Sequence, residues 1–275
     1  MIEETRQNDA YISRRIPVPL AFQEVFSHFY IAENRGAQAI SLTLLPSYQM
    51  IMVFNFGTPV FIVTPDKEEV IINTCLVAGP VRQAFDYTLP PGAEILVANF
   101  KDDAFFRFFG VASMDRAFSA HPDALLHDNC FIELWTELRR MNSESRIGRI
   151  LDFCKPYIRE RSSIAGQIAG FSDDCLNPVK ELSGKNNISE RSVQLSHKKH
   201  FGFSAKEMAR YSRFIKAIGM IQHLCSNSPK VDWFEVIHGC GYYDQSQLIH
   251  DFKHYLHLSP TQYLQFQQGI CNPVI

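Results

Sequence analysis

Side chains that can form hydrogen bonds with DNA bases gather in one segment near the end of the chain. Residues 245–255 have helical periodicity, because the apolar residues Leu248, Phe252 and Tyr255 recur at i, i+4 and i+7. The opposite side of this predicted helix carries Gln245, Ser246, Gln247, His250 and Lys253. Glutamine, serine and histidine can bind base edges in the major groove, and lysine can bind a phosphate. The segment therefore predicts a recognition helix in which Lys253 contacts phosphate and the other four polar residues read bases.

The residues before this segment complete a helix-turn-helix unit. Residues 231–238 have the pattern of a short helix, Gly239 and Gly241 lie in a turn, and Asp244 is a suitable N-cap for the second helix. The two glycines have no strand before them and no third glycine after them. They therefore form a turn and not a dinucleotide-binding loop.

Residues 237–264 resemble the second helix-turn-helix of the AraC/XylS family of bacterial transcription regulators. The resemblance is carried by Gly-Tyr-Tyr-Asp-Gln-Ser at 241–246, the Phe252-Lys253 pair, and Ser-Pro-Thr-Gln-Tyr at 259–263. Family members carry aromatic, acidic and glutamine residues after the turn glycine, then a Phe-Lys pair, then Ser-Pro-x-x-Tyr at the end of the domain. The resemblance implies sequence-specific binding to double-stranded DNA.

Residues 186–202 resemble the first helix-turn-helix of the same family. Asn186 and Asn187 suit a turn, Ser189 is a good N-cap, and Gly202 is a suitable helix end. The family motif implies base reading by Arg191, Gln194 and Leu195. It also implies contacts of Ser189, Lys198 and Lys199 with the phosphate backbone.

Two residues of this first unit depart from the family pattern. Leu195 stands where arginine is common, and His197 stands where a core phenylalanine is usual. Leucine can touch a thymine methyl, whereas arginine would read guanine or bind a phosphate, so we expect lower affinity or a different base preference. His197 places a polar ring in a small core and requires a partner there.

A long helix is predicted between the two units. The apolar residues between 204 and 225 keep a helical period, and a helix of this length spans about 33 Å at ~1.5 Å per residue. One turn of B-DNA measures roughly 34 Å, so such a helix would hold two recognition helices in successive major grooves. Residues 203–207 and 258–262 are similar to each other, which indicates a duplicated architecture.

The first half of the chain is predicted to be β-rich. Strand-like segments lie at 39–45, 50–56, 60–63, 70–77 and 94–100, with proline and glycine turns between them. Residues 1–17 are expected to be a loose lead-in. This pattern predicts a β-sandwich or small barrel. Residues 45–110 resemble the cupin-like N-terminal domain of a subgroup of the same regulators, which implies that this domain senses a signal or mediates dimerisation.

Two amphipathic helices are predicted after the strands, at 128–141 and 146–159. They can pack against the β domain, or they can form a homodimer through residues 128–159. The boundary between the two domains is predicted at residues 159–163. The predicted fold class is therefore α+β, with a cupin-like barrel or sandwich and flanking helices at 1–161. An all-α DNA-binding domain with two helix-turn-helix units joined by a long helix is predicted at 162–275.

The charge of the chain divides between these two halves. Residues 1–161 carry 16 basic and 20 acidic side chains and residues 162–275 carry 11 and 9, so the net charges are −4 and +2. The weakly basic second half is expected to make few phosphate contacts and to bind DNA with modest, salt-sensitive affinity.

Catalytic, metal and cofactor sites are not expected. The seven cysteines are scattered without a Cys-x-x-Cys pair, which predicts buried free thiols. The first half has His28, His121 and His127, all expected to lie outside the strands, so a metal-dependent cupin enzyme is disfavoured. No apolar run of eighteen residues is present and the start is polar, so no membrane span is expected and the protein is predicted to be cytoplasmic.

An alternative interpretation makes the β domain the working part, as a small-molecule binder or cupin-like enzyme beside a degenerate DNA-binding domain. A small-molecule effector fits either interpretation. The phenylalanines of the first half permit an apolar pocket but are more often plain core. They are Phe54, Phe56, Phe61, Phe85, Phe100, Phe105 and Phe106.

Overall fold

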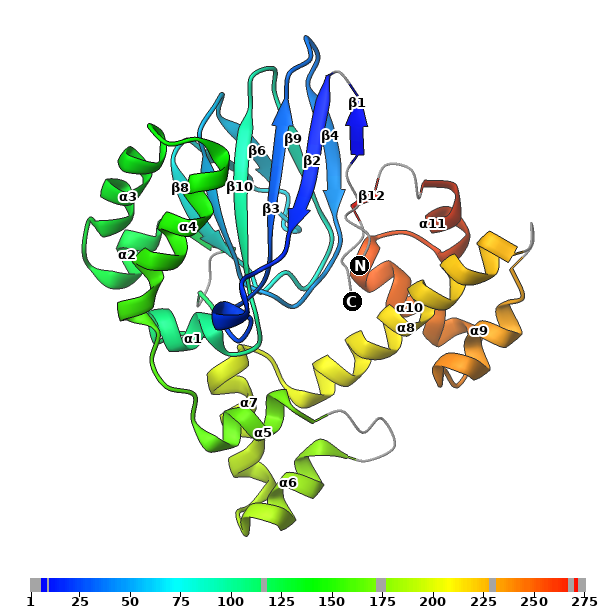
Figure 1. Ribbon diagram of the computed structural model, residues 1–275. Coiled ribbons are helices and arrows are strands. Elements are labelled where there is room, and N and C mark those ends of the chain that lie inside the picture. Colours follow the sequence, from blue (N-terminus) through cyan, green and yellow to red (C-terminus); the bar gives the residue numbers. More distant parts are fainter. Residues whose placement is uncertain are drawn as a thin grey trace.

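The computed structural model describes residues 6–8, 10–114, 118–171, 177–227, 231–266 and 270–271. The first part of the chain forms β-sheets with flanking helices, and the second part is a series of helices beneath them (Figure 1). The predicted α+β fold class is confirmed.

The strands form two sheets that face each other. The first sheet has the order β1 (Arg6–Asn8), β2 (Tyr11–Ile16), β3 (Phe26–Asn34), β10 (Glu94–Phe100), β5 (Ile51–Asn55), β8 (Cys75–Ala78) and β11 (Ser119–Ala120). The second has the order β12 (Ile270–Cys271), β4 (Ile40–Leu44), β9 (Phe85–Leu89), β6 (Val60–Val63) and β7 (Glu69–Ile72). Apolar residues of both sheets, such as Val53 and Ile62, share one buried cluster, so the sheets form a sandwich.

Most of the predicted strands are present, with two corrections. The segment 70–77 is two strands, β7 and β8, which belong to different sheets. The prediction of a loose lead-in at 1–17 is wrong, because β2 pairs with β3 over its whole length, from Tyr11 opposite Asn34 to Ile16 opposite Phe29. β2 was not predicted because Arg14 and Arg15 interrupt its apolar residues. Its extended conformation depends on hydrogen bonding to β3 and not on a local apolar pattern.

Helices cover the outer face of the first sheet (Figure 1). They are α1 (Ala104–Phe109), α2 (Pro122–Leu126), α3 (Cys130–Leu138) and α4 (Ser143–Cys154). Phe131 and Leu134 of α3 and Ile150 of α4 are buried in the same cluster as Phe54 and Phe100 of the sheet. The helices predicted at 128–141 and 146–159 are thus confirmed, and their apolar sides pack on the sheet. The exposed apolar sides that motivated the predicted homodimer through residues 128–159 are therefore covered by the sheet.

Two buried asparagines link the two sheets at the strand ends. Asn34 Nδ2 donates to the carbonyl oxygen of Leu89 and Asn55 Nδ2 to that of Ile72, both at 2.8 Å. Each Oδ1 accepts the backbone N–H of a glycine two residues later, Gly36 or Gly57. A Cβ at Gly57 would lie 2.1 Å from the carbonyl oxygen of Gly92, so this turn requires glycine.

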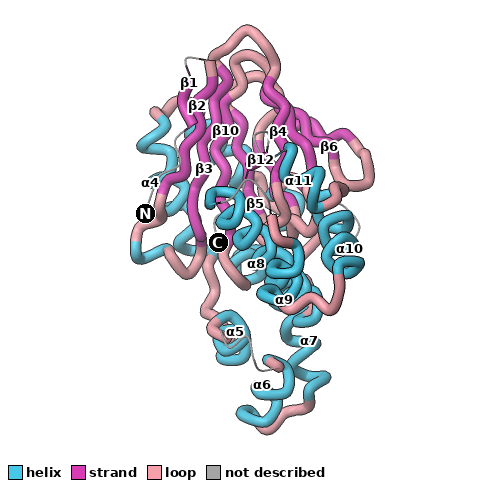
Figure 2. Tube along the Cα trace, turned by 90° about the vertical axis from the view of Figure 1, so that its right-hand side faces the viewer, coloured by secondary structure: helices cyan, strands magenta, loops and turns pink. Residues whose placement is uncertain are grey.

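The second part of the chain contains two helix-turn-helix units and a linker helix. The helices are α5 (Ser163–Ala169), α6 (Pro178–Asn186), α7 (Glu190–Phe201), α8 (Ala205–Asn227), α9 (Trp233–Cys240), α10 (Gln245–Leu256) and α11 (Pro260–Phe266). The units are α6–α7 and α9–α10, and α8 joins them (Figures 1 and 2). With 23 residues, α8 spans about 34 Å. None of the described helices is long and apolar enough to cross a membrane.

Replacing Asn55 with alanine is expected to lower the free energy of unfolding by about 1–3 kcal/mol, because it removes the side-chain partner of the Ile72 carbonyl in the second sheet and of backbone groups in the turn at Gly57 and Thr58. Urea denaturation at neutral pH measures the change. Asn129→Ala is the control, since Asn129 is exposed and makes no side-chain capping bond to α3. Equal stability of the two variants would contradict the linking role of Asn55.

Candidate nucleic-acid interface

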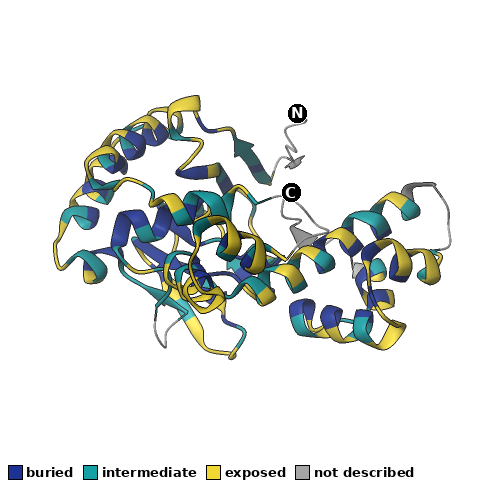
Figure 3. Cartoon of the chain, turned by 90° about the horizontal axis from the view of Figure 1, so that it is seen from below, coloured by how far each residue is buried: buried dark blue, intermediate teal, exposed yellow. Residues whose placement is uncertain are grey.

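The helix α10 divides into a buried and an exposed side. Leu248, Phe252 and Tyr255 are fully buried. Most of the predicted contact residues are exposed, namely Gln245, Ser246, His250 and Lys253. The exposed residues of the second half lie on the outer sides of its helices (Figure 3). This face can meet a DNA groove without unfolding of the helix.

Gln247 also has a structural role that the sequence analysis missed. Its Oε1 accepts the backbone N–H of Tyr243 at 2.9 Å, while its own backbone N–H donates to Asp244 Oδ1 at 2.8 Å. The two side chains thus form a reciprocal cap at the start of α10. The spacing Asp-x-x-Gln is the signal that could have revealed it.

The helix α7 also presents its predicted contact residues to solvent. Those exposed are Arg191, Gln194, Leu195, Lys198 and Lys199. Ser189 caps the helix by accepting the backbone N–H of Ser192, as expected for its place in the unit. Leu195 is 59% exposed, so an apolar side chain stands on the outer face of this helix. Lys199 Nζ also lies 5.9 Å from the ring of Phe106 in α1, where it borders the β part.

His197 has the partner that its burial requires. Its Nδ1 lies 2.7 Å from the carbonyl oxygen of Phe203, and a carbonyl only accepts, so Nδ1 carries the proton. Burial lowers the pKa of His197, which favours the neutral ring. The histidine therefore fits the small core of the first unit by donating one hydrogen bond.

A buried carboxylate joins α10 to the linker helix α8. Asp251 is 1% exposed and accepts from Arg210 Nε at 2.6 Å and from Arg213 Nη2 at 3.0 Å. The Arg213 guanidinium also lies 4.6 Å from the ring of Tyr242. The contacts of Asp251 with Arg210 and Arg213 were not predicted from the sequence. An aspartate beside Phe252 on an apolar helix side was the signal, because a buried charge requires a partner.

Three consecutive residues of the β part bind the ends of α7 and α10. Arg82 Nη2 donates to the carbonyl oxygen of Gly202, which caps α7. Gln83 Nε2 donates to the carbonyl oxygen of His254 at 3.0 Å, and the backbone N–H of Ala84 to that of Tyr255 at 2.8 Å. The final carbonyls of a helix have no partner within the helix, so these donors complete the last turns of both helices.

A tyrosine of the β part adds an aromatic contact at this junction. Its ring centroid lies 5.0 Å from that of Phe203 and 4.6 Å from that of Tyr211. This residue, Tyr48, is buried in one cluster with Phe214 and Tyr255 of the helical part. The hydroxyl of Tyr211 donates to the carbonyl oxygen of Pro46 at 2.8 Å. The β part and the helical part therefore share a core.

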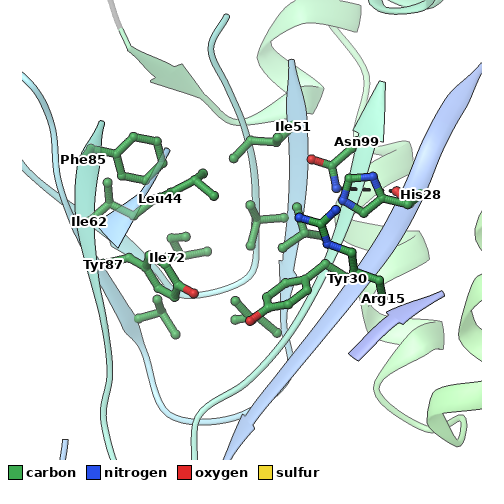
Figure 4. Close-up of a pocket in the computed structure, with 14 residues that line it drawn as sticks. Arg15, His28, Tyr30, Leu44, Ile51, Ile62, Ile72, Phe85, Tyr87 and Asn99 are labelled. Atoms are coloured by element: carbon green, nitrogen blue, oxygen red, sulfur yellow. Dashed lines mark hydrogen bonds between the residues drawn. The ribbon is translucent and has the colours of Figure 1, made fainter. Parts of the chain in front are cut away.

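A small cavity lies between the two sheets (Figure 4). Its volume is about 90 Å³ and its walls are mostly aliphatic. Arg15, His28 and Asn99 lie together at one end of it (Figure 4). Of the phenylalanines considered above, Phe85 lines the cavity, whereas others such as Phe54 belong to the core under α3 and α4.

The expectation that His28 lies outside the strands is wrong, because it stands on β3 and faces this cavity. The sequence around it, Phe26–Asn34, is aromatic at its start and was not recognised as a strand. Burial, with a smaller contribution from the charge of Arg15, lowers the pKa of His28 to about 4. The ring is neutral at pH 7, so the positive charge of this end comes from Arg15.

Possible metal ligands and free thiols are the remaining groups with chemical potential in the described residues. Among them, no group of three histidine, cysteine, aspartate or glutamate side chains is placed to hold a metal. The five cysteines with described side chains are free thiols, and burial raises the pKa of Cys75 to about 12. Cys175 lies outside the described residues, and of Cys271 only the backbone is described.

Comparison with known proteins finds distant likenesses. No protein-family model and no curated protein matches the chain. A solved structure of ToxT from Vibrio cholerae is similar at 13% identity over 86% of this chain and 98% of that chain, with a TM-score of 0.40. ToxT with a bound unsaturated fatty acid is similar at 11% identity over 98% and 99%, with a TM-score of 0.40.

A part of the chain is similar to a solved structure of oxalate decarboxylase OxdC from Bacillus subtilis. The identity is 14%, over 35% of this chain and 27% of that chain, and the TM-score is 0.27. At these identities and TM-scores the likenesses assign neither a family nor a function.

The stability of the protein is expected to fall as the pH is lowered from about 6.5 to about 4. His28 titrates at 6.5 when unfolded and at about 4 when folded, so the unfolded chain binds more protons in this window. The lowered pKa values of His197 and His254 act in the same direction. One such group contributes at most about 1.4 kcal/mol per pH unit.

Urea midpoints at several pH values measure this dependence. His28→Gln is expected to make it shallower, and exposed His238→Gln is the control. An unchanged slope in His28→Gln would show that His28 is not the group responsible.

Proposed function

We propose that the chain is a sequence-specific, cytoplasmic DNA-binding transcription regulator. Residues 162–275 form its DNA-binding domain and residues 1–161 its sensing domain. The observation that carries this proposal is the pair of helix-turn-helix units joined by α8. A linker of about 34 Å matches one turn of B-DNA, so two recognition helices can enter successive major grooves on one side of the duplex.

Each recognition helix contributes base and phosphate contacts to this proposal. In α7 the base-reading residues are Arg191, Gln194 and Leu195, and Ser189, Lys198 and Lys199 bind phosphates. In α10 they are Gln245, Ser246, Gln247 and His250, with Lys253 on the phosphate. Because Oε1 of Gln247 already accepts a hydrogen bond in the cap, we assign its base contact to the donor Nε2 group.

The sensing domain acts through its contact with the ends of α7 and α10. Phe85 lines the cavity and directly follows Ala84, whose N–H binds the last turn of α10. Leu44 lines it too, and lies two residues before Pro46, whose carbonyl binds Tyr211 of α8. A change in the cavity can therefore reach the recognition helices through two short backbone segments.

The effector is a small and mainly apolar molecule with an acidic or polar group near Arg15. The walls supply apolar contact, and the guanidinium supplies charge-assisted hydrogen bonds. A cavity of about 90 Å³ is smaller than an ordinary ligand pocket, which measures roughly 300–1,000 Å³. A ligand of ordinary size must displace the lining residues, Phe85 and Leu44 among them, and this displacement is the signal.

The proposal is tested by selecting duplexes from a random pool with the full-length protein, followed by binding at two salt concentrations. Two half-sites about one helical turn apart are expected. A single enriched half-site would exclude base reading by one unit. Enrichment of no sequence, with or without small apolar carboxylates added, would refute sequence-specific binding.

Removal of a base contact and removal of a phosphate contact are expected to differ. Gln245→Ala and Arg191→Ala should weaken binding to the selected duplex by about 1–3 kcal/mol and leave binding to random duplex unchanged. Lys198→Ala should weaken both alike and reduce the dependence on salt. Titrations of both duplexes measure this, and equal losses on both for Gln245→Ala would contradict its base-reading role.

Loss of the aromatic contact at the junction is expected to loosen the recognition helices. Tyr48→Ala removes a buried ring. It should reduce the free energy that holds the β part against the helical part by about 2–4 kcal/mol. Hydrogen exchange of the amides in the last turns of α7 and α10 should become faster. Tyr243→Ala is the control, because that ring is 92% exposed. Unchanged exchange in Tyr48→Ala would argue against control through this contact.

A further inference from the structure

We infer that His250 reads a hydrogen-bond acceptor on a base, with guanine favoured over cytosine, because Arg210 determines which nitrogen of its ring carries the proton. This inference rests on the proposed function. It concerns one contact of α10, and it assigns a role in specificity to Arg210, a residue of the linker helix α8.

The position of the proton follows from one contact. Nη2 of Arg210 lies 3.0 Å from Nδ1 of His250. A guanidinium group has donors and no acceptor, so Nδ1 must accept and must carry a lone pair. A neutral imidazole then has its proton on Nε2. His250 is exposed on the side of α10 that carries the other base-reading residues, so Nε2–H is the group that it offers to DNA.

The arginine is held in place by the buried carboxylate next to this histidine. Arg210 Nε donates to Asp251 Oδ1 at 2.6 Å, and Asp251 Oδ2 accepts from Arg213 Nη2 at 3.0 Å. The Arg210 guanidinium also lies 5.5 Å from the ring of Tyr255. Because one edge of the guanidinium is fixed by Asp251, its Nη2 is directed to His250. Residues 250 and 251 of α10 thus use the same arginine.

Arg210 has the opposite effect on the His250 proton from that of the usual neighbours of a histidine. A carboxylate or carbonyl beside Nδ1 would keep the proton on Nδ1 and leave Nε2 as an acceptor. His197 in the first unit shows that case, because its Nδ1 donates to a carbonyl. The arginine beside His250 does the opposite. His197 in α7 and His250 in α10 therefore have different tautomers, each determined by its partner.

The consequence for base preference follows from the groups in the major groove. Guanine presents two acceptors there, N7 and O6, and thymine presents the acceptor O4, whereas cytosine presents only the N4 donor group. An Nε2–H can donate to guanine or thymine and faces a second donor at cytosine. The positive charge of Arg210 nearby also favours the electronegative edge of guanine. We therefore expect guanine first at the base that His250 contacts, and cytosine last.

The tautomer is tested first, in the full-length protein without DNA. Long-range proton–nitrogen NMR with labelled histidine reports which ring nitrogen of His250 is protonated. At mildly alkaline pH, wild type is expected to show protonated Nε2, and Arg210→Met a mixture of both tautomers. Arg213→Met is the matched control, because Arg213 binds Asp251 but makes no contact with His250 in the described structure. Protonated Nδ1 in wild type would overturn the inference whether or not the protein binds DNA.

The base preference is tested second, by selection from a random pool. The position whose preference disappears in His250→Ala is the one that His250 reads, and wild type is expected to prefer guanine over cytosine there by about 10-fold. Arg210→Met should reduce this ratio to about 2-fold while the other positions of the motif keep their preferences, which shows that the variant is folded. Arg213→Met should keep the ratio.

The outcomes separate the two proposals. Wild type that selects a motif but prefers cytosine at the His250 position, or a guanine preference that is unchanged in Arg210→Met, overturns the role of Arg210 and leaves the regulator intact. Replacement of that guanine by 7-deazaguanine in the wild-type site removes N7 without any protein variant, and a loss of affinity of about 5-fold or more supports donation to N7. Selection of no motif overturns the proposed function, and the base preference with it.

Discussion

The arrangement of α7 and α10 depends on one junction, where residues 45–48 and 81–84 of the β part pack on the helical part. Donors from residues 82–84 bind the last carbonyls of α7 and α10, and Tyr48 is buried between aromatic rings of the helical part. Both helices are therefore tied at their C-terminal ends to the same short loop. A rigid α8 sets the distance between the helices, and this loop contributes to the angle at which each helix is held.

Buried polar groups make the structure specific at the places where apolar packing alone would allow several arrangements. Asn34 and Asn55 align the two sheets, and Asp251 aligns α10 on α8. Each of these groups would be costly without its partners, so only the register that supplies them is stable. In the second unit one of these buried contacts is linked to an exposed residue, because Arg210 contacts both the buried Asp251 and the exposed His250.

Local patterns in the sequence predicted the helical part well. The N-caps Ser189 and Asp244, the helix end at Gly202 and the long apolar period of α8 are all present, because caps and helical periodicity depend on residues close in the chain. The strands were predicted less completely. The strand β2 contains two arginines and owes its conformation to pairing with β3, while β3 contains His28 and pairs with both β2 and β10. Such pairing comes from distant residues, which single segments do not reveal.

The sequence by itself therefore determined the α+β class, the two helix-turn-helix units and the set of polar residues on their outer sides, because these follow from periodicity and caps within a few turns of chain. Only the tertiary structure showed which of those side chains already make contacts within the protein. It places Gln247 in a cap, Nδ1 of His250 beside Arg210, and Arg82 on the end of α7. These are contacts between residues up to 120 positions apart, and their energy depends on burial and on the partner's charge, neither of which is a property of the local sequence.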